Sequence, residues 1–504
     1  MKTKVIFVKP PGDDRVLLEA GRALREGAVV AFPTETVYGL GASALLPEAV
    51  LDIFRLKGRP ADNPLIVHLL SADDLEGVVS DIPPVFQALY QAFSPGPLTF
   101  VMPRHPGLSP LVTGGLETVA VRFPAQPAAR ALLRASGVPI VAPSANLSGR
   151  PSPTRARHVL DDFAGRIPYV IDGGPSEVGL ESTVLDLLSD PPRILRPGRV
   201  TAADIEEKTG IRVVRWEDQP RGDEESRPVS PGMKYRHYAP RAEVRIVLPQ
   251  EDEEIAEAFL RVLEVMEGSP ALFLSEESWD EIRARLSEGK KDVPLPPAYT
   301  YEGGRNLDRA GSHLFDGLRT LDEEGPSLIL AEGFFGPESA AYMDRLTKAS
   351  RMPALVRRVL FICEGNTCRS PMAEAIFNDR YRELGFWAES AGIGVIAGQT
   401  MAENALLALE EWGIDPGSRK SRQFRARMVR EADLVVTMTG LQRDFLLQNV
   451  PGAKGRILSA ADLTGQGDIR DPYGQPLHAY RRVRDQLGSL VHEIYDRLIL
   501  TESK

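Results

Sequence analysis

The sequence is poor in cysteine, with only Cys363 and Cys368 among its 504 residues. A secreted scaffold held by disulfides needs many cysteines spread along the chain, so this class is excluded. Two thiols also cannot complete a four-thiolate zinc site. We therefore expect a cytoplasmic chain from a reducing environment, with one local thiol feature.

Other absences narrow the class of protein further. No run approaches the roughly 18 consecutive apolar residues of a membrane span, and the N-terminal MKTKVIFVKPPGDD lacks the pattern of a secretory signal. The composition, 43% hydrophobic and 26% charged, has none of the bias of disordered, collagen-like or coiled-coil chains. The net charge of −10 gives no overall attraction to nucleic acid. We expect neither a membrane nor DNA as a partner.

The length predicts about three domains at roughly 150 residues each. Residues 1–212 alternate apolar runs, which are typical of buried strands, with segments of helical spacing. The runs lie at 27–33, 64–70, 97–102 and 138–144, and the helical segments include 16–25 and 47–56. This pattern predicts an α/β domain.

Residues 213–240 are rich in charge, proline and glycine, which predicts a linker. The strand–helix alternation then resumes in a small α/β domain at 241–350, with no evident chemistry of its own. Its expected strands are 244–248, 271–274 and 327–332, and its expected helix is 251–267. A third domain, 355–504, is predicted to begin with a strand at 359–362 and a helix from about 370, and to include a strand at 432–438.

The two cysteines fall in CEGNTCRS (363–370), between the expected strand and helix of the third domain. A loop with this spacing can wrap a tetrahedral oxyanion with backbone N–H groups and a helix N-terminus. We expect the Cys363 thiolate to attack phosphorus, Arg369 to grip the phosphate oxygens and Ser370 to donate to the sulfur. Asn366 tolerates left-handed backbone and can brace the loop.

A thiolate that displaces a leaving group needs an acid to protonate that group. Asp471, followed by Pro472 and Tyr473, is the candidate, and the ring of Tyr473 can form a wall for a flat substrate. Cys368 has two interpretations. It is a packing residue, or it protects Cys363 through a reversible disulfide.

With its ESAG (389–392) and DPY motifs, the segment 355–504 resembles the low-molecular-weight protein phosphatases. The resemblance implies a four-stranded parallel sheet, a catalytic trio of Cys363, Arg369 and Asp471, phosphorylated proteins as substrates and no cofactor. Thr367 and the tail resemble the protein-arginine-phosphatase branch more closely than the tyrosine-specific one. Glu364 departs from the expected residue beside the nucleophile.

Two alternatives remain open for this domain, a tyrosine-specific phosphatase and an arsenate reductase. The relay of the second needs a further, distant cysteine, and the chain has none.

The N-terminal part contains no Walker loop, so a nucleotide site there must be of another kind. Polar clusters instead follow several apolar runs, at the strand mouths where α/β sheets bind ligands. Taken singly, each cluster is more often structural. Lys57-Gly58-Arg59 is usually a solvated turn, and His68 is usually a satisfied core histidine.

Taken together, the clusters of residues 1–212 resemble a YrdC-type domain. With SPGMKYRHYAP (230–240), residues 1–350 resemble the long form of L-threonylcarbamoyladenylate synthase, whose C-terminal domain is small and Rossmann-like. The resemblance implies that L-threonine, bicarbonate and ATP, with Mg²⁺ expected beside ATP, give threonylcarbamoyl-AMP and pyrophosphate. The product serves tRNA modification, so tRNA and the threonylcarbamoyl-transfer machinery are implied partners.

The same resemblance assigns the site residues. The threonine site would be Thr36, His68, Arg122 and Ser182. The ATP site would be Lys57, Arg59, Asn63, Thr118, Ser144, Asn146, Ser152 and Arg196, with Tyr235 of the linker closing over the nucleotide. We expect no dedicated metal site.

Two hypotheses follow for the whole chain. In the first, it is a bifunctional enzyme, a threonylcarbamoyl-AMP synthase joined to a phosphatase. In the second, residues 1–350 are an RNA-binding module without catalysis. A pure RNA binder has no need of Lys57, Arg59, Ser144, Asn146 and Arg196 together, which favours the first hypothesis.

Overall fold

The computed structural model describes residues 2–9, 14–215, 238–249, 254–265, 270–287, 295–350, 358–381, 386–417, 419–432, 434–450, 453 and 455–500. These residues belong to two compact units. The first comprises 1–246, 267–332 and 338–350, and the second comprises 247–266, 333–337 and 351–504. Within the described ranges, no helix is both long and apolar enough to cross a membrane.

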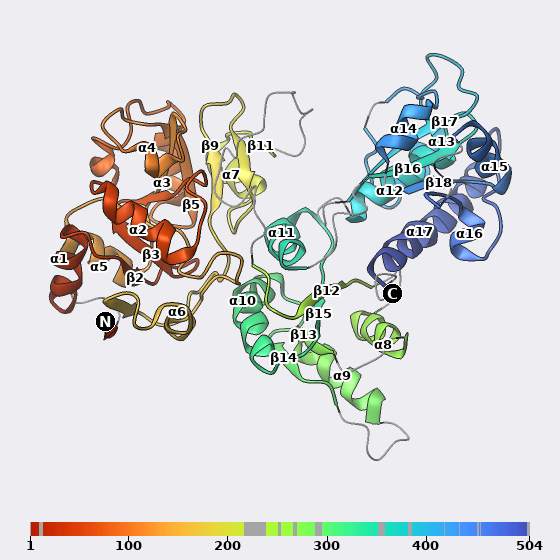
Figure 1. Ribbon diagram of the computed structural model, residues 1–504. Helices are drawn as coiled ribbons and strands as arrows, with labels where there is room; N and C mark the ends of the chain where they lie inside the picture. The colour runs from red at the N-terminus through yellow and green to blue at the C-terminus, as the bar shows by residue number, and fades with distance from the viewer. Residues whose placement is uncertain are drawn as a thin grey trace. The chain divides into compact units, whose positions relative to one another are not determined.

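The first unit contains a mixed sheet, of which Figure 1 labels β2, β3, β5, β9 and β11. The order of its strands is β1-β8-β2-β3-β7-β4-β6-β5-β9-β10-β11. Its strands are β1 Lys4–Phe7, β2 Val30–Phe32, β3 Gly39–Ser43, β4 Ile66–His68, β5 Leu98–Pro103, β6 Thr118–Arg122, β7 Ile140–Val141, β8 Tyr169–Asp172, β9 Thr183–Asp186, β10 Arg193–Arg196 and β11 Val214–Arg215. It combines parallel and antiparallel pairs. The four apolar runs predicted as strands each contain one, although β7 has only two residues.

The helices of this part are α1 Leu18–Arg25, α2 Pro47–Lys57, α3 Phe86–Phe93, α4 Pro110–Thr113, α5 Pro127–Ser136, α6 Ala156–Phe163 and α7 Ala202–Thr209, with short 3-10 turns η1 Asp14–Leu17 and η2 Ala72–Leu75. Helix α2 begins on Pro47, which suits a first helical turn. It ends where Gly58 adopts φ 62°, a left-handed value that glycine tolerates. Lys57 and Arg59 therefore flank a helix end, and the alternative interpretation as a solvated turn does not hold for Lys57, which is buried.

A second sheet, in the order β12-β15-β13-β14, belongs to the segment predicted as a small α/β domain. Its strands are β12 Glu243–Val247, β13 Ala271–Ser275, β14 Ala298–Tyr301 and β15 Leu328–Glu332. The helices of the segment are α8 Ile255–Val265, α9 Glu276–Ser287, α10 Leu307–Glu323 and α11 Ala340–Ala349, with a 3-10 turn η4 Pro337–Ser339. Strand β13 pairs in parallel with both neighbours, so the α/β class holds here too.

The second unit contains a four-stranded sheet, β17-β16-β18-β19, in which every pair is parallel, as the sequence predicted. Its strands are β16 Arg358–Cys363, β17 Trp387–Gly392, β18 Leu434–Thr437 and β19 Ile457–Ser459. Its helices are α12 Arg369–Tyr381, α13 Glu403–Glu410, α14 Ala426–Glu431, α15 Gly440–Asn449, α16 Ala460–Thr464 and α17 Leu477–Leu500. Central strand β16 ends on Cys363 and α12 begins on Arg369, which places both cysteines in a strand–loop–helix turn.

Candidate active sites

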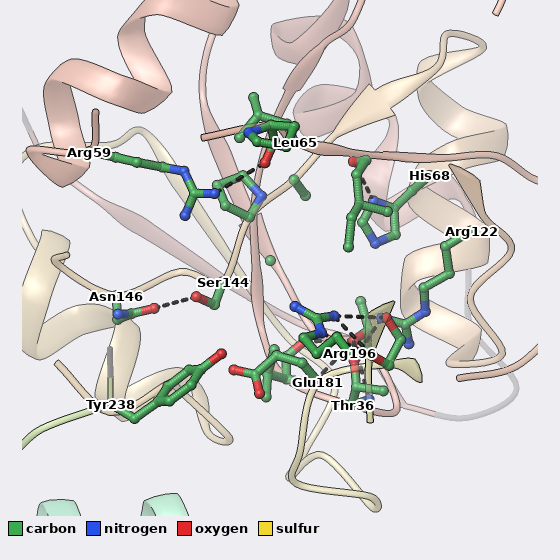
Figure 2. A pocket seen from close by; sticks show the side chains of 18 residues that line it. Thr36, Arg59, Leu65, His68, Arg122, Ser144, Asn146, Glu181, Arg196 and Tyr238 are labelled. Atoms are coloured by element: carbon green, nitrogen blue, oxygen red, sulfur yellow. Dashed lines mark hydrogen bonds between the residues drawn. The ribbon is translucent and has the colours of Figure 1, made fainter. Parts of the chain in front are cut away.

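A pocket in the first unit encloses about 660 Å³, part of it open to solvent. Eight residues that the sequence assigned to threonine or ATP line it, namely Thr36, Arg59, His68, Arg122, Ser144, Asn146, Ser182 and Arg196. Figure 2 shows two groups across the pocket, with Ser144 and Asn146 on one side and His68 and Arg122 on the other. The fold thus converts scattered clusters into one cavity.

Arg122 forms the charged centre of one side of the pocket. Its Nη1 donates to Thr36 Oγ1 at 2.7 Å, and its Nη2 lies 2.7 Å from Glu35 Oε1. All three side chains are buried. Glu35 was not among the predicted site residues, although it directly precedes Thr36 in the segment PTETVYG (33–39). The ion pair with Glu35 holds the guanidinium of Arg122 in one orientation beside Thr36.

His68 lies on the same side, with Nδ1 3.2 Å from the carbonyl of Ile66. Burial, and then the charge of Arg122, lower the pKa of His68 to about 3. The ring is therefore neutral near pH 7. A neutral ring adds no cation beside Arg122, so the positive charge next to Thr36 comes from the guanidinium of Arg122.

On the other side, Ser144 Oγ donates to Asn146 Oδ1 at 2.5 Å. Beneath this loop, Lys57 Nζ donates to the carbonyls of Ser144 and Asn146. Burial, and then the charge of Arg59, hold the pKa of Lys57 well below its ordinary value. Lys57 does not line the pocket, and instead it fixes the backbone from which Ser144 and Asn146 project.

Among the described residues, three other predicted ATP residues do not line the pocket. Asn63 is buried, and neither of its amide atoms has a hydrogen-bond partner. Thr118 is half-buried at the start of β6. Ser152 donates to Glu181 Oε1 at 2.6 Å. Tyr235 lies outside the described residues.

Tyr238 lines the pocket and was not predicted, although it stands in the same motif as Tyr235. Its backbone has φ 70°, and its ring lies 5.2 Å from that of Phe315. Burial raises the pKa of its phenol, so the hydroxyl stays protonated. The presence of two tyrosines in SPGMKYRHYAP is the signal that could have included it.

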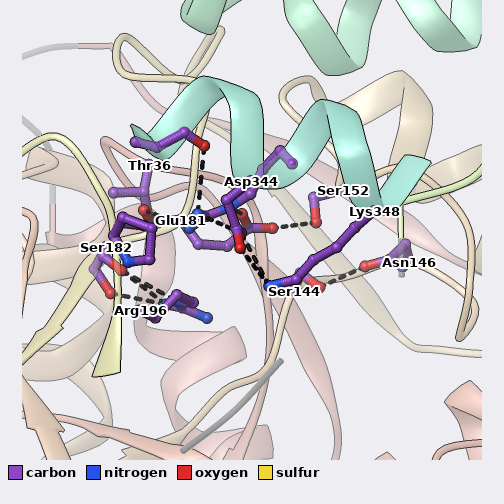
Figure 3. Close-up of polar contacts among 12 residues, drawn as sticks. Thr36, Ser144, Asn146, Ser152, Glu181, Ser182, Arg196, Asp344 and Lys348 are labelled. Atoms are coloured by element: carbon purple, nitrogen blue, oxygen red, sulfur yellow. Dashed lines mark hydrogen bonds and ion pairs between the residues drawn. The ribbon is translucent and has the colours of Figure 1, made fainter. Parts of the chain in front are cut away.

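Ser182 and Arg196 both line the pocket and are joined by hydrogen bonds (Figure 3). Arg196 donates from Nε and Nη2 to the Ser182 carbonyl, at 3.1 and 2.9 Å, and from Nη2 to Ser182 Oγ at 3.2 Å. Thr99 Oγ1 lies 2.7 Å from Ser182 Oγ. The resemblance assigned Ser182 to threonine and Arg196 to ATP, so a residue predicted for each substrate is in contact with one predicted for the other.

In the second unit, the loop after β16 surrounds the sulfur of Cys363. Ser370 Oγ lies 2.9 Å from Cys363 Sγ, and the backbone N–H of Asn366 donates to Sγ at 3.3 Å. Asn366 has φ 54°, a left-handed value, and its Nδ2 donates to Ser370 Oγ and Ser390 Oγ at 3.0 and 2.7 Å. The asparagine therefore fixes the loop around Cys363, the predicted nucleophile.

Arg369 and Asp471 form an ion pair across this loop. Arg369 is buried and also donates from Nη1 to the Ile469 carbonyl at 3.1 Å, whereas Asp471 is half-exposed. Tyr473 is exposed, and its backbone N–H donates to Asp471 Oδ1 at 3.1 Å. The predicted clamp and the predicted acid thus lie within contact of each other.

Both cysteines are free and buried. Cys368 Sγ lies 3.6 Å from both Thr367 Oγ1 and Tyr480 Oη, and burial raises the pKa of its thiol. Thr367 is also buried. Among the residues the structure describes, no group of three or more His, Cys, Asp or Glu side chains could hold a metal ion.

Three family models match successive parts of the chain. The model described as "Telomere recombination" matches residues 22–198, and "Threonylcarbamoyl-AMP synthase, C-terminal domain" matches 200–351. "Low molecular weight phosphotyrosine protein phosphatase" matches 358–502.

Similar proteins point to the same families. A threonylcarbamoyl-AMP synthase of Bacillus subtilis is 43% identical over 69% of this chain and 98% of its own length, and one of Pyrococcus abyssi is 42% identical with the same coverage. A crystal structure of the P. abyssi protein with L-threonine superposes with TM-score 0.60 at 41% identity, covering 69% of this chain and 98% of that one. The chain therefore belongs to the threonylcarbamoyl-AMP synthase family, and it carries a low-molecular-weight protein phosphatase domain after its synthase part.

Proposed function

We propose that residues 1–350 make threonylcarbamoyl-AMP from L-threonine, bicarbonate and ATP. The proposed parts are a synthase domain at 1–212, a linker at 213–240 and a small domain at 241–350, with the phosphatase at 355–504. The observation that carries the proposal is the pocket that gathers Arg122 with Thr36 on one side and Ser144 with Asn146 on the other.

In this proposal Arg122 binds the carboxylate of L-threonine, since a fixed guanidinium suits two parallel hydrogen bonds. The relative from P. abyssi, whose structure holds L-threonine, supports this substrate. Thr36, Ser182 and the neutral ring of His68 complete the site. The amine of threonine condenses with bicarbonate, losing water, and gives a carbamate within reach of the nucleotide.

Arg59, Ser144, Asn146 and Arg196 hold ATP, which arrives with Mg²⁺ as part of the substrate. A carbamate oxygen attacks the α-phosphorus, the bond to the β-phosphate oxygen breaks, and pyrophosphate leaves. The products are threonylcarbamoyl-AMP, which the tRNA-modifying machinery uses, and pyrophosphate. Asn63 does not line the pocket, but its buried side-chain amide has no hydrogen-bond partner and is proposed as a further polar contact to the nucleotide.

The test is incorporation of labelled pyrophosphate into ATP by the pure protein. Exchange is expected only when both threonine and bicarbonate are present, because the carbamate must form before pyrophosphate can leave. Reactions that lack either substrate serve as controls. Folded protein that binds RNA but shows no exchange would support the RNA-binding module instead.

For the second unit, we propose hydrolysis of phosphoarginine in proteins. The Cys363 thiolate attacks phosphorus, the P–N bond breaks, and Asp471 protonates the leaving guanidine. Water then hydrolyses the cysteinyl phosphate and releases inorganic phosphate. Arg369, which pairs with Asp471 when no phosphate is bound, moves its donors to the phosphate oxygens.

Thr367 supports phosphoarginine over phosphotyrosine, because it places a buried hydroxyl in the loop that holds the nucleophile. We expect Thr367→Ile to move the ratio of kcat/KM values at least about tenfold toward phosphotyrosine. Thr367→Ser keeps the hydroxyl and is the matched control. The measurement compares kcat/KM for one substrate protein carrying phosphoarginine with kcat/KM for the same protein carrying phosphotyrosine. A wild-type preference for phosphotyrosine would show that Thr367 is not the determinant.

A further inference from the structure

Two arginines from the small domain reach the loops that line the synthase pocket. Arg319 of α10 donates to the Pro151 carbonyl at 2.7 and 3.0 Å and pairs with Asp162 at 2.9 Å. Arg345 of α11 is fully buried and pairs with Glu181 Oε2 at 2.9 Å. Both belong to the first unit, as does the pocket. The small domain therefore takes part in building the synthase site.

Arg345 contacts the carboxylate of the adjacent Asp344 at 2.9 Å and two loops next to pocket residues. Its Nη2 donates to the Glu181 carbonyl at 3.3 Å, and its Nη1 donates to the Pro197 carbonyl at 2.7 Å. These carbonyls directly adjoin Ser182 and Arg196 in the sequence. Arg345 thus donates to backbone carbonyls directly before Ser182 and directly after Arg196.

Glu181 is the buried carboxylate with which Arg345 forms its ion pair. Its carboxylate lines the pocket, is buried, and accepts from Ser152 Oγ as well as from Arg345. Burial alone would raise the pKa of Glu181, but the charges of Arg345 and, next, of Arg196 lower it. A buried carboxylate needs a cationic partner, and two arginines are near enough to serve.

We propose that Arg345 is a positioning residue of the synthase, which acts as the counter-ion of Glu181 and so keeps Arg196 on Ser182, oriented toward the nucleotide. Without Arg345, Glu181 is left buried without its ion-pair partner, and Arg196 is the other arginine whose charge acts on it. Arg196 then turns to the carboxylate and loses its orientation for phosphate. This inference rests on the proposed role of Arg196 in binding ATP.

The test measures binding of α,β-methylene-ATP and of L-threonine by calorimetry on the full chain. Arg345→Met is expected to weaken binding of the ATP analogue about 10- to 100-fold, as for loss of a charge-assisted contact, and to change threonine binding less than about threefold. Arg345→Met with Glu181→Gln removes both charges, while the amide oxygen can still accept from Ser152. This double variant is expected to recover analogue binding to within about fivefold of wild type.

Recovery of analogue binding in the double variant indicates an effect of charge, because Glu181→Gln does not refill the space that Arg345→Met leaves. Arg309→Met, on an exposed arginine of α10, is the surface control. If Arg345→Met does not fold, Arg345→Lys is decisive, because it keeps the charge and is expected to bind the analogue within about threefold of wild type.

Three outcomes overturn the inference: unchanged analogue binding by Arg345→Met, no recovery in the double variant, or strong loss in Arg345→Lys. Failure of the wild type to bind the analogue contradicts the proposed function itself, and is distinguishable from these.

Discussion

Replacing Cys363 with serine is expected to lower the hydrolysis of p-nitrophenyl phosphate at least about 10³-fold. A serine hydroxyl is not ionised near neutral pH, so it cannot attack phosphorus as a thiolate does. The substitution nearly keeps the size of the side chain, and the contacts of Ser370 and Asn366 with this atom can persist. A steady-state assay of the pure variant measures the loss.

Cys368→Ser is the matched control, because it changes the other thiol of the same loop. It is expected to keep the rate within about tenfold of wild type. The Cys363→Ser chain should also retain threonine-dependent pyrophosphate exchange, which shows that the protein is intact. If Cys363→Ser leaves the phosphatase activity unchanged, Cys363 is not the nucleophile.

The second large effect is expected at Arg122. Arg122→Met removes the guanidinium proposed to bind the threonine carboxylate, and we expect threonine affinity to fall at least about 100-fold, or about 2.7 kcal/mol. It also leaves Glu35 buried without its cation, which typically costs about 3–5 kcal/mol of folding stability. Calorimetry with L-threonine and thermal unfolding measure the two effects.

A paired variant separates these effects. Arg122→Met with Glu35→Gln removes both buried charges, so most of the folding stability should return, while threonine affinity should stay low. The amide oxygen introduced by Glu35→Gln can still accept from the backbone N–H groups of Ala125 and Gln126, as the Glu35 carboxylate does. Threonine binding by the paired variant within about threefold of wild type would contradict the role of Arg122.

The α/β class and nine of the 19 described strands were predictable, because short apolar runs between Gly and Pro leave few alternatives. The structure differs at Lys57, which the sequence grouped with the ATP contacts. Helix α2 ends at this lysine and turns its amine onto the carbonyls of Ser144 and Asn146, 87 and 89 positions further along the chain. Such a contact depends on where the loop returns, and no local pattern carries that information.

The residues that sequence reasoning missed are those whose role depends on a partner. Glu35 and Glu181 adjoin predicted residues, but a carboxylate beside a motif has no evident role until its arginine is known. The partner of Glu181 is Arg345, 164 positions away in a domain without evident chemistry of its own. Tyr238 was missed for a similar reason, since its place in the pocket follows from packing on Phe315.

The sequence by itself determined the local geometry of the loop at 363–370. Cys363, Asn366, Arg369 and Ser370 are nearly adjacent in the chain, so a strand end, one left-handed residue and a helix start suffice to set their geometry. Only the tertiary structure decided the synthase pocket, because its residues come from distant strand ends and loops. There, ion pairs such as Glu181–Arg345 form when α11 packs against the pocket loops, and burial makes each charge depend on its partner.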